Sequence, residues 1–390
     1  MADLPRLPFE RTDLLGISGA YAALRAREPI TRVRTRTGDE GWLVTGYDQA
    51  RAILADQRFG RSHPDPDHAP RLSNSAITGG PTGEFATEKD VHDRMRRLLA
   101  PAFSARRMRA LAGRVQELVD DLLDRMEEHG PPLDLHAALS VPLPIQVICE
   151  LLGVPLADRD HFRAIADEMT DLTDPDRSAA ARTAMEEYSH GIVKAKRDDP
   201  GEDVYSDLAQ ADLPAEEVAT IAGGLLFAGH ETTVNRIDHG VLILLANPDQ
   251  LAALRRDPAL APAAVEEIMR AAVPNDHGLA RYAREDVEVD GVRIRAGELC
   301  VISTAAANRD ETVFTDPERF DIGRDPQPHL GFGYAIRYCL GANLARVELR
   351  AVFGSLFQRF PGLRLAVPID RLPRRADRLT GGVSALPVTW

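Results

Sequence analysis

The sequence has little cysteine, few aromatic residues and no long apolar run. Its three cysteines, Cys149, Cys300 and Cys339, are odd in number and widely spaced, which excludes a disulfide framework and indicates a reducing compartment. The most apolar runs, residues 221–229 and 241–246, are too short to span a bilayer. The N-terminal residues also lack the apolar core of a signal peptide. We therefore expect a soluble cytoplasmic protein.

The sequence also has no excess of positive charge. Lys and Arg total 47 against 60 Asp and Glu, giving a net charge of -13. This balance excludes a general attraction to nucleic acid. The hydrophobic content of 44% and charged content of 27% are those of an ordinary globular protein, and no internal repeat or low-complexity block is present.

The hydrophobic patterns predict a mainly α protein with small β-sheets, of the α+β class. Helical periodicity dominates from about residue 89 to 272. Strand patterns flank it, and Asp290-Gly291 is a strong hairpin turn between residues 287–289 and 292–294. A first hairpin is expected from residues 30–36 and 42–46, followed by a long loop over residues 59–83. We expect one domain, 1–390, with a β-rich lobe (about 30–60 and 280–330) and a helical lobe (about 89–272 and 340–360).

The most informative stretch runs from Phe332 to Gly341 and contains Cys339 in a glycine-bearing loop before an apolar helix that begins near Leu340. A thiol at a helix N-terminus meets the positive end of the helix dipole, which favours the thiolate. A thiolate can ligate iron, and on haem iron it promotes O–O cleavage. The alternative is an inert, buried cysteine.

A second stretch lies at the centre of a long helical pattern from Pro214 to Ala246, which would extend about 50 Å. Here Gly229 weakens the helix and Thr232 can bond back to a carbonyl, so we predict a local opening or kink. Glu231 and Thr232 place an acid beside an alcohol, the groups needed to move protons. The alternative is a buried helix with packed threonines, and His230 is expected to be a polar helix-face residue rather than a metal ligand.

Two further pairs have helical spacing. His92 and Arg96 are four residues apart, so that both can grip an anion from one helix face. A solvated basic face is the alternative. Glu267 and Arg270 are three residues apart and can form an ion pair on one helix.

These stretches, in this order, resemble the cytochrome P-450 family of haem-thiolate monooxygenases, in its soluble bacterial form. The match to the haem-binding loop includes Phe332, Gly333, Arg337, Cys339 and Gly341, and departs at Ala335, where the family most often has glycine. Residues 228–233 match the oxygen-activation motif without departure. The resemblance implies a mainly helical fold that holds haem b between the long central helix and the cysteine-loop helix, with Cys339 as the iron ligand.

The resemblance also implies roles for other residues. Contacts to haem are implied for His92, Arg96, Arg281, Arg337, Phe332, Gly333, Gly341, Ala228 and Gly229. Glu267 and Arg270 are implied to form a structural set completed by Arg319, which stabilises the fold and retains haem. The implied substrate pocket includes Phe85, Leu225, Ala228, Asn275, His277, Gly278, Leu279 and Leu379.

Electrons need another source, because the sequence has no flavin or nucleotide signature. The resemblance implies delivery from NAD(P)H through a ferredoxin reductase and a small acidic ferredoxin. Basic residues that could dock this partner are Arg94, Arg97, Arg106, Arg107, Arg109, Arg346 and Arg350. Scattered surface arginines are the alternative, and we expect a monomer.

The predicted function is insertion of one oxygen atom from O₂, by hydroxylation or epoxidation, into a small natural product of secondary metabolism. Polar groups at Asn275, Asp276 and His277 favour a substrate that forms hydrogen bonds, such as a macrolide, cyclic peptide or terpenoid. One alternative is radical coupling of aromatic rings, for example in a cyclic peptide, and peroxide-driven oxidation is less favoured because Glu231 and Thr232 are both present. A further alternative is a haem sensor without turnover.

Overall fold

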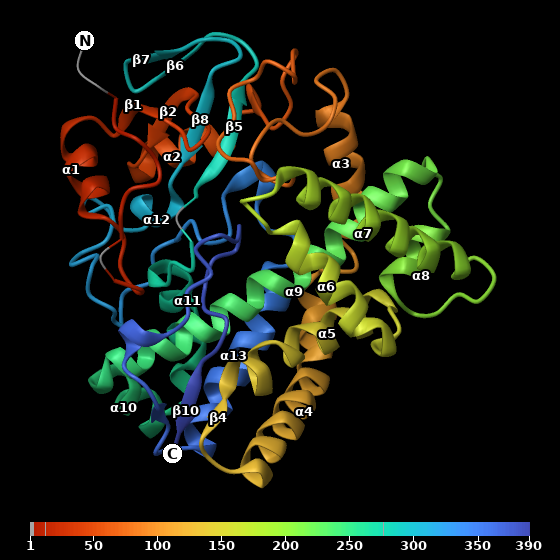
Figure 1. The fold of residues 1–390 in the computed structure, drawn as a ribbon, viewed down its shortest axis with the longest axis vertical. Helices are drawn as coiled ribbons and strands as arrows, with labels where there is room; N and C mark the ends of the chain where they lie inside the picture. Colours follow the sequence, from red (N-terminus) through yellow and green to blue (C-terminus); the bar gives the residue numbers. More distant parts are fainter. Residues whose placement is uncertain (1–3, 12, 276) are drawn as a thin grey trace. The chain divides into compact units, whose positions relative to one another are not determined.

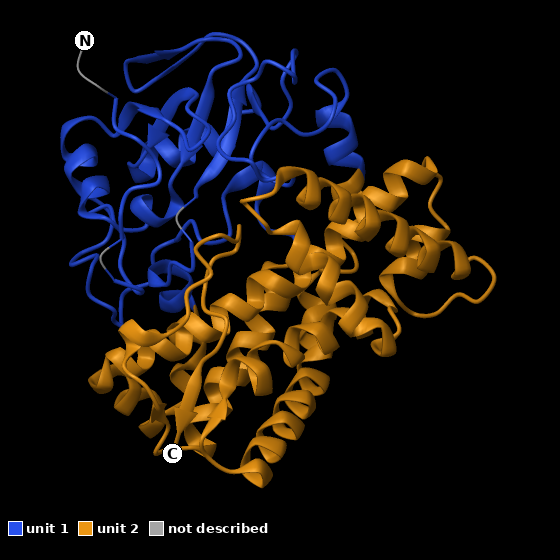
Figure 2. Ribbon diagram, viewed as in Figure 1, with its two compact units in different colours: residues 1–94, 266–340 blue, residues 95–265, 341–390 orange. Residues whose placement is uncertain are grey.

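The computed structural model describes residues 4–11, 13–275 and 277–390, and these are mostly helical with three small sheets (Figure 1). This confirms the predicted fold class. The chain divides into two compact units, shown in Figure 2: unit 1 is residues 1–94 with 266–340, and unit 2 is residues 95–265 with 341–390. The two segments expected to be β-rich belong to unit 1. That all 390 residues act as one domain stays a prediction.

Unit 1 is built on a five-stranded sheet in the order β1-β2-β8-β5-β3. Neighbouring strands are antiparallel except β2 and β8, which are parallel. The strands are β1 (Ile30–Arg34), β2 (Glu40–Val44), β3 (Phe59–Gly60), β5 (Leu279–Ala283) and β8 (Leu299–Ile302). The expected first hairpin is therefore confirmed as β1 and β2, and the expected long loop follows β3.

The hairpin around Asp290-Gly291 is also confirmed. Strands β6 (Val287–Val289) and β7 (Val292–Ile294) pair in antiparallel register. Asp290 has φ 50° and Gly291 φ 76°, the two positive values that a tight two-residue hairpin turn requires. The local turn chemistry alone was sufficient to predict this element.

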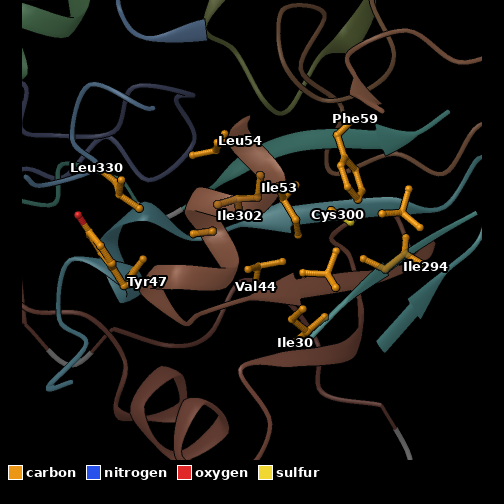
Figure 3. Packing of buried hydrophobic residues seen from close by; sticks show 14 of the residues in the cluster. Ile30, Val44, Tyr47, Ile53, Leu54, Phe59, Ile294, Cys300, Ile302 and Leu330 are labelled. Atoms are coloured by element: carbon orange, nitrogen blue, oxygen red, sulfur yellow. The ribbon is translucent and has the colours of Figure 1, made fainter. Parts of the chain in front are cut away.

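One of the two hydrophobic clusters of unit 1 lies between the sheet and helix α2 (Tyr47–Ala55), as Figure 3 shows, and the other includes Leu43 and Val301. Alternate residues of the strands, including Val44 and Ile302, point toward Ile53 and Leu54 of the helix, and all four side chains are buried. This packing fixes the sheet from which β5 presents Arg281. Two more helices belong wholly to this unit, α1 (Gly19–Arg27) and α12 (Thr304–Ala307).

Unit 2 is organised around one long helix, α9 (Ala215–Ala246). It begins after Pro214 and ends before Asn247-Pro248, as the sequence predicts. The helices packed against it include α5 (Pro142–Leu152), α7 (Pro175–Ala195), α8 (Val204–Ala209), α10 (Pro248–Arg256) and α13 (Ala342–Arg359). Because helices pack on several sides of α9, most of its surface is buried. The few exposed positions therefore mark the part of α9 that a ligand can reach.

The remaining helices are α4 (Ala105–His129), α6 (Arg159–Met169), a π-helix (His136–Ser140), and α3 (Glu88–Leu99) and α11 (Ala261–Ala271), which contain unit boundaries. Short 3₁₀ turns cover Leu156–Asp158, Pro258–Leu260, Ala335–Arg337 and Ile369–Arg371. Unit 2 contains a three-stranded sheet with the strand order β4-β10-β9. Its strands are β4 (Leu133–Asp134), β9 (Arg364–Leu365) and β10 (Pro387–Thr389). Across the described ranges, no helix is both long and apolar enough to cross a membrane.

The predicted pair of Glu267 and Arg270 is present in unit 1 and fully buried. Arg270 donates two hydrogen bonds to the carboxylate, from Nη2 to Oε1 at 2.7 Å and from Nε to Oε2 at 2.8 Å. It also donates to the backbone carbonyls of Asn308, Pro317 and Arg319. The ion pair therefore ties helix α11 to the segment that precedes the cysteine loop.

The prediction that the side chain of Arg319 completes this set is wrong. Its side chain is 62% exposed and lies 3.8 Å from Asp321, so only its backbone carbonyl takes part. Arg324 occupies the role instead, because its Nε lies 3.3 Å from Oε1 of Glu267 and its other nitrogens donate to loop carbonyls. The resemblance assigned the arginine of the segment Pro317-Glu318-Arg319-Phe320, whereas the arginine whose side chain contacts Glu267 follows that segment.

Replacing Arg324 is therefore predicted to destabilise the protein more than replacing Arg319. Arg324→Ala removes a charged hydrogen bond from a buried carboxylate and should lower the free energy of unfolding by about 2 kcal/mol. Arg319→Ala, the matched control, should change it by less than about 0.5 kcal/mol. Urea unfolding midpoints of the two variants measure the difference, and a larger loss for Arg319→Ala would restore the original assignment.

Candidate functional site

The cysteine loop of unit 1 closes on itself through backbone hydrogen bonds. The N–H of Gly333 donates to the carbonyl of Leu330 at 2.9 Å, and the N–H of Cys339 donates to that of Phe332 at 2.8 Å. Gly333 and Ala335 have positive φ values, 71° and 51°. The loop thus turns sharply twice before Cys339, three residues ahead of the first residue of α13.

Cys339 differs from the other two cysteines in its exposure. Cys149 and Cys300 are buried, whereas the side chain of Cys339 is exposed. Burial raises the pKa of Cys149 to about 12 and also raises the pKa of Cys300, which keeps both as neutral thiols. Of the three, Cys339 is the sulfur that a metal can reach.

Arg337, in the same loop, is held by a buried carboxylate. Its Nη2 pairs with Oε1 of Glu88, and Arg284 approaches the other carboxylate oxygen at 3.2 Å. Glu88 also accepts hydrogen bonds from the backbone N–H groups of Arg61 and Ser62, at 2.7 and 3.0 Å. These contacts fix a network of basic groups beside the cysteine loop, within unit 1. Sequence reasoning missed Glu88, Arg284 and Arg61, because their spacing carries no recognisable pattern.

Arg281 on β5 belongs to the same positive cluster. It is only 7% exposed and donates to the carbonyl of Ala280 at 2.8 Å. Burial, and then the neighbouring charges of Arg61 and Arg337, lower the pKa of Arg281 to about 9. The carboxylate of Glu88 thus faces several guanidinium groups, and a ligand with two carboxylates would relieve their repulsion. This donor set fits the propionates of haem.

The two predicted propionate donors of α3 lie on one helix, four residues apart, as expected. His92 is largely buried, with its Nδ1 3.5 Å from a carboxylate oxygen of Asp93, and Arg96 is partly buried. Two donors at this spacing project from one helix face. Their contact with an anion stays a prediction.

In unit 2, helix α9 exposes a narrow stripe of small residues at Gly224, Ala228 and Thr232, each four positions apart, while most of its centre is buried. Thr232 Oγ1 donates to the carbonyl of Ala228 at 2.9 Å, which is the back-bond expected from the sequence. The alcohol of the predicted acid–alcohol pair is therefore accessible. Leu225 and Gly229, beside the stripe, are partly buried.

The structure shows a packing contact of Gly229, and its contact with haem stays a prediction. Helix α9 is assigned as helix from Ala215 to Ala246, so the predicted opening does not interrupt it. A Cβ at Gly229 would lie 2.4 Å from Cδ1 of Ile148 on α5, so a larger residue would require that side chain to move. This contact depends on the packing of two helices and has no signal in the sequence.

Glu231 is 3% exposed, although it directly precedes the accessible Thr232. Its Oε1 accepts from Nη1 of Arg375 and from Oγ1 of Thr380, both at 2.9 Å. Arg375 also donates to Asp167 on α6, at 2.5 Å. Sequence reasoning missed Arg375 and Thr380, because they follow Glu231 by more than a hundred residues and belong to no recognisable motif.

His230 is buried and neutral. Burial lowers its pKa to about 4, and within the described residues its ring nitrogens make no hydrogen bond. Its ring contacts Phe162 of α6 edge-on, at a centroid distance of 6.2 Å. The side chain therefore points into packed protein rather than along the exposed stripe.

The predicted pocket residues are divided between the units. Phe85, Asn275, His277, Gly278 and Leu279 lie in unit 1, and Leu225, Ala228 and Leu379 lie in unit 2. Phe85 stacks under the guanidinium of Arg284 at 3.8 Å, and Gly278 has φ 76°. Asp276 lies outside the described residues. A shared contact of these residues with substrate stays a prediction.

The predicted docking arginines are mostly on the surface. Arg97, Arg106, Arg109 and Arg350 are exposed. Arg107 donates to the carbonyl of Glu202 and lies 3.9 Å from Asp207. Their role in binding a partner stays a prediction.

Comparison with known proteins gives matches over the whole chain. A family model described as cytochrome P-450 matches residues 194–364. Pentalenolactone synthase of Streptomyces exfoliatus is 43% identical, over 100% of both chains. Nocardicin C N-oxygenase of Nocardia uniformis subsp. tsuyamanensis is also 43% identical, over 100% of this chain and 99% of that protein. The crystal structure of the LnmA cytochrome P-450 hydroxylase, from the leinamycin biosynthetic pathway of Streptomyces atroolivaceus, has a TM-score of 0.89 and 40% identity, over 99% of this chain and 100% of that chain.

The positive φ of Ala335 leads to a stability prediction. An L-residue with a side chain is strained in the left-handed region by about 1 kcal/mol, and glycine is not. Ala335→Gly should therefore raise the free energy of unfolding by a few tenths to about 1 kcal/mol. Ala345→Gly, in the ordinary helical backbone of α13, is the control and should lower it by about 1 kcal/mol. Thermal unfolding of both variants checks the sign, and destabilisation by Ala335→Gly would contradict the strain.

Proposed function

The chain belongs to the cytochrome P-450 family, and from that premise we propose that it is a monooxygenase that uses O₂ and two electrons to hydroxylate or epoxidise a small natural product of secondary metabolism. The observation that carries this proposal is the buried Glu231 followed by the accessible Thr232 on α9. Its relatives include a synthase of pentalenolactone and an N-oxygenase of nocardicin C.

We propose haem b as the cofactor, with Cys339 Sγ as the iron ligand. The exposed sulfur and the surplus of buried guanidinium groups suit a metal with two attached carboxylates. Arg281, Arg337, His92 and Arg96 would bind the propionates. The backbone of the loop, with Phe332, Gly333 and Gly341, would lie against the macrocycle, as would Ala228 and Gly229 of α9. When bound, haem supplies reductive activation of O₂.

The protein's own part is to control protons. The hydroxyl of Thr232 is accessible and holds its proton by donation to the carbonyl of Ala228. That proton is shared with a backbone acceptor rather than a base, so the hydroxyl can turn to donate to a ligand or water. Glu231, the preceding residue, has a buried carboxyl group that can relay a proton toward it.

Electrons are proposed to come from NAD(P)H through a ferredoxin reductase and a ferredoxin. Exposed arginines of α4, including Arg106 and Arg109, would attract an acidic partner although the whole protein carries a net charge of -13. The proposed substrate forms hydrogen bonds, because Asn275 and His277 lie in the segment that precedes β5.

The sulfur ligand is tested by Cys339→Ser. The reduced CO complex of the parent should show the red-shifted Soret band of a thiolate ligand, and the variant should lose it, because a serine oxygen is a weaker electron donor. Cys149→Ala, which removes a buried thiol, is the control and should keep the band. An unchanged band in Cys339→Ser would refute the assigned ligand and the function with it.

Proton control is tested by Thr232→Ala. The variant should bind substrate as the parent does but form about tenfold less product per electron, releasing hydrogen peroxide instead, because the hydroxyl no longer places a proton. Thr233→Ala, at the neighbouring buried position, should keep the parent yield. Product and peroxide are measured per NAD(P)H consumed, and a parent-like yield for Thr232→Ala would mean that another group delivers the proton.

A further inference from the structure

The chain after β9 contains a loop, residues 374–383, that is folded against α6 and α9 within unit 2; we call it the tail loop. It closes through a bridge between Arg374 and Val383 and through the N–H of Arg375, which donates to the carbonyl of Gly382 at 3.0 Å. Backbone hydrogen bonds join it to the end of α6, from Leu379 to Thr170 at 2.8 Å and from Leu172 to Asp377 at 2.9 Å. The tail loop is thus an ordered structure with fixed neighbours.

The tail loop also lies directly on α9, one turn after Glu231. A Cβ at Gly382 would lie 1.8 Å from Oδ1 of Asn235, and Gly382 has φ 86°. Only glycine permits this approach. Asn235 in turn donates from Nδ2 to the carbonyl of Glu231 at 3.1 Å. The backbone of the tail loop is therefore placed by contact with the same helical turn that carries the acid.

Two side chains of the tail loop hold the carboxylate of Glu231. Arg375 and Thr380 both donate to Oε1, and the second amino group of Arg375 donates to Asp167, whose side chain is 45% exposed. His230, a further base near this carboxylate, is neutral, and its Nδ1 is 4.0 Å from Oε2. Arg375 is therefore the cation that compensates the buried charge.

Arg375 is positively charged. Burial lowers the pKa of Arg375, but the charges of Glu231 and Asp167 outweigh burial, so the net shift is upward. A buried carboxylate that loses such a partner takes up a proton, because an unpaired charge is far more costly inside a protein than in water. The guanidinium of Arg375, with the hydroxyl of Thr380, thus fixes the position of the Glu231 carboxylate.

We propose that Arg375 is a positioning residue for proton delivery: with Thr380 it holds Glu231 ionised and in place, and through Asp167 it connects this acid to the exposed side of α6. The inference rests on the proposed function, in which Glu231 supplies protons to Thr232. Leu379, a predicted pocket residue, lies between the two holding residues. A substrate that displaces Leu379 therefore also shifts the groups that hold the acid.

The experiment uses the haem-loaded protein and two measurements. Infrared spectroscopy at neutral pH detects the C=O stretch of a protonated carboxylic acid, and the Glu231→Gln variant identifies the contribution of this residue. The second measurement is the fraction of consumed O₂ released as hydrogen peroxide, with NADPH, a plant-type ferredoxin and its reductase as electron source and no added substrate.

Arg375→Ala should gain a carboxylic acid band that Arg375→Ala/Glu231→Gln lacks, and its peroxide fraction should rise about threefold. Arg375→Lys keeps a cation and should return both values toward the parent. Thr380→Val should raise the peroxide fraction less, without a new band. Arg374→Ala is the matched control: Arg374 belongs to the same loop and has an exposed side chain, and this variant should match the parent in both measurements.

The proposal is overturned if Arg375→Ala shows neither change, or if Arg374→Ala shows the same changes. If Arg375→Ala does not fold, Arg375→Lys and Thr380→Val decide it, and parent-like peroxide in Thr380→Val overturns the shared holding of Glu231. A parent that lacks the thiolate band of the reduced CO complex refutes the proposed function instead. In that case the infrared measurement still decides whether Arg375 keeps Glu231 ionised.

Discussion

A carboxylate buried in a protein needs a compensating cation, and three glutamates impose this requirement on the fold. Glu88, Glu231 and Glu267 are all less than 9% exposed. Their arginine partners are, in that order, Arg284 with Arg337, then Arg375, then Arg270 with Arg324. Most of these partners are distant in sequence, so their pairs form only when separate segments have docked, whereas Arg270 lies on the same helix as Glu267. Leaving one such charge unpaired costs about 3–5 kcal/mol. The native state is therefore stable only when all three glutamates have their arginine partners.

Glu348 shows the other solution to the same problem. It is 1% exposed on α13, and its carboxyl oxygens make no hydrogen bond within the described part of the chain. Burial raises the pKa of Glu348 well above its usual range, so this acid is neutral. Unit 2 therefore buries Glu231 beside the guanidinium of Arg375, and Glu348 without a hydrogen-bond partner among the described residues. The difference lies in the environment, because the two side chains are chemically identical.

Local signals account for what the sequence predicted. The hairpin at Asp290-Gly291, the ends of α9 at Pro214 and Pro248, and the pairing of Glu267 with Arg270 each depend on residues within a few positions of one another. The failures involve long-range contacts. The side chain of Arg324, not that of Arg319, contacts Glu267. Gly229 packs against Ile148 of another helix. Arg375 donates to Glu231, which lies 144 positions earlier in the chain. A single sequence has no spacing that encodes such contacts, so the motif residues were found without the neighbours that control them.

The close fit of Gly382 against Asn235 limits which sequence changes the tail loop can accept. Residues 376–381 lie between two fixed points, the holding arginine and the glycine contact, and their length cannot change without moving one of them. Exchange of side chains at constant loop length leaves both fixed points in place, whereas an insertion or deletion moves Arg375 relative to Gly382. The predicted pocket position Leu379 lies in this segment, so side-chain exchange there is the change that keeps the contacts of Glu231 intact.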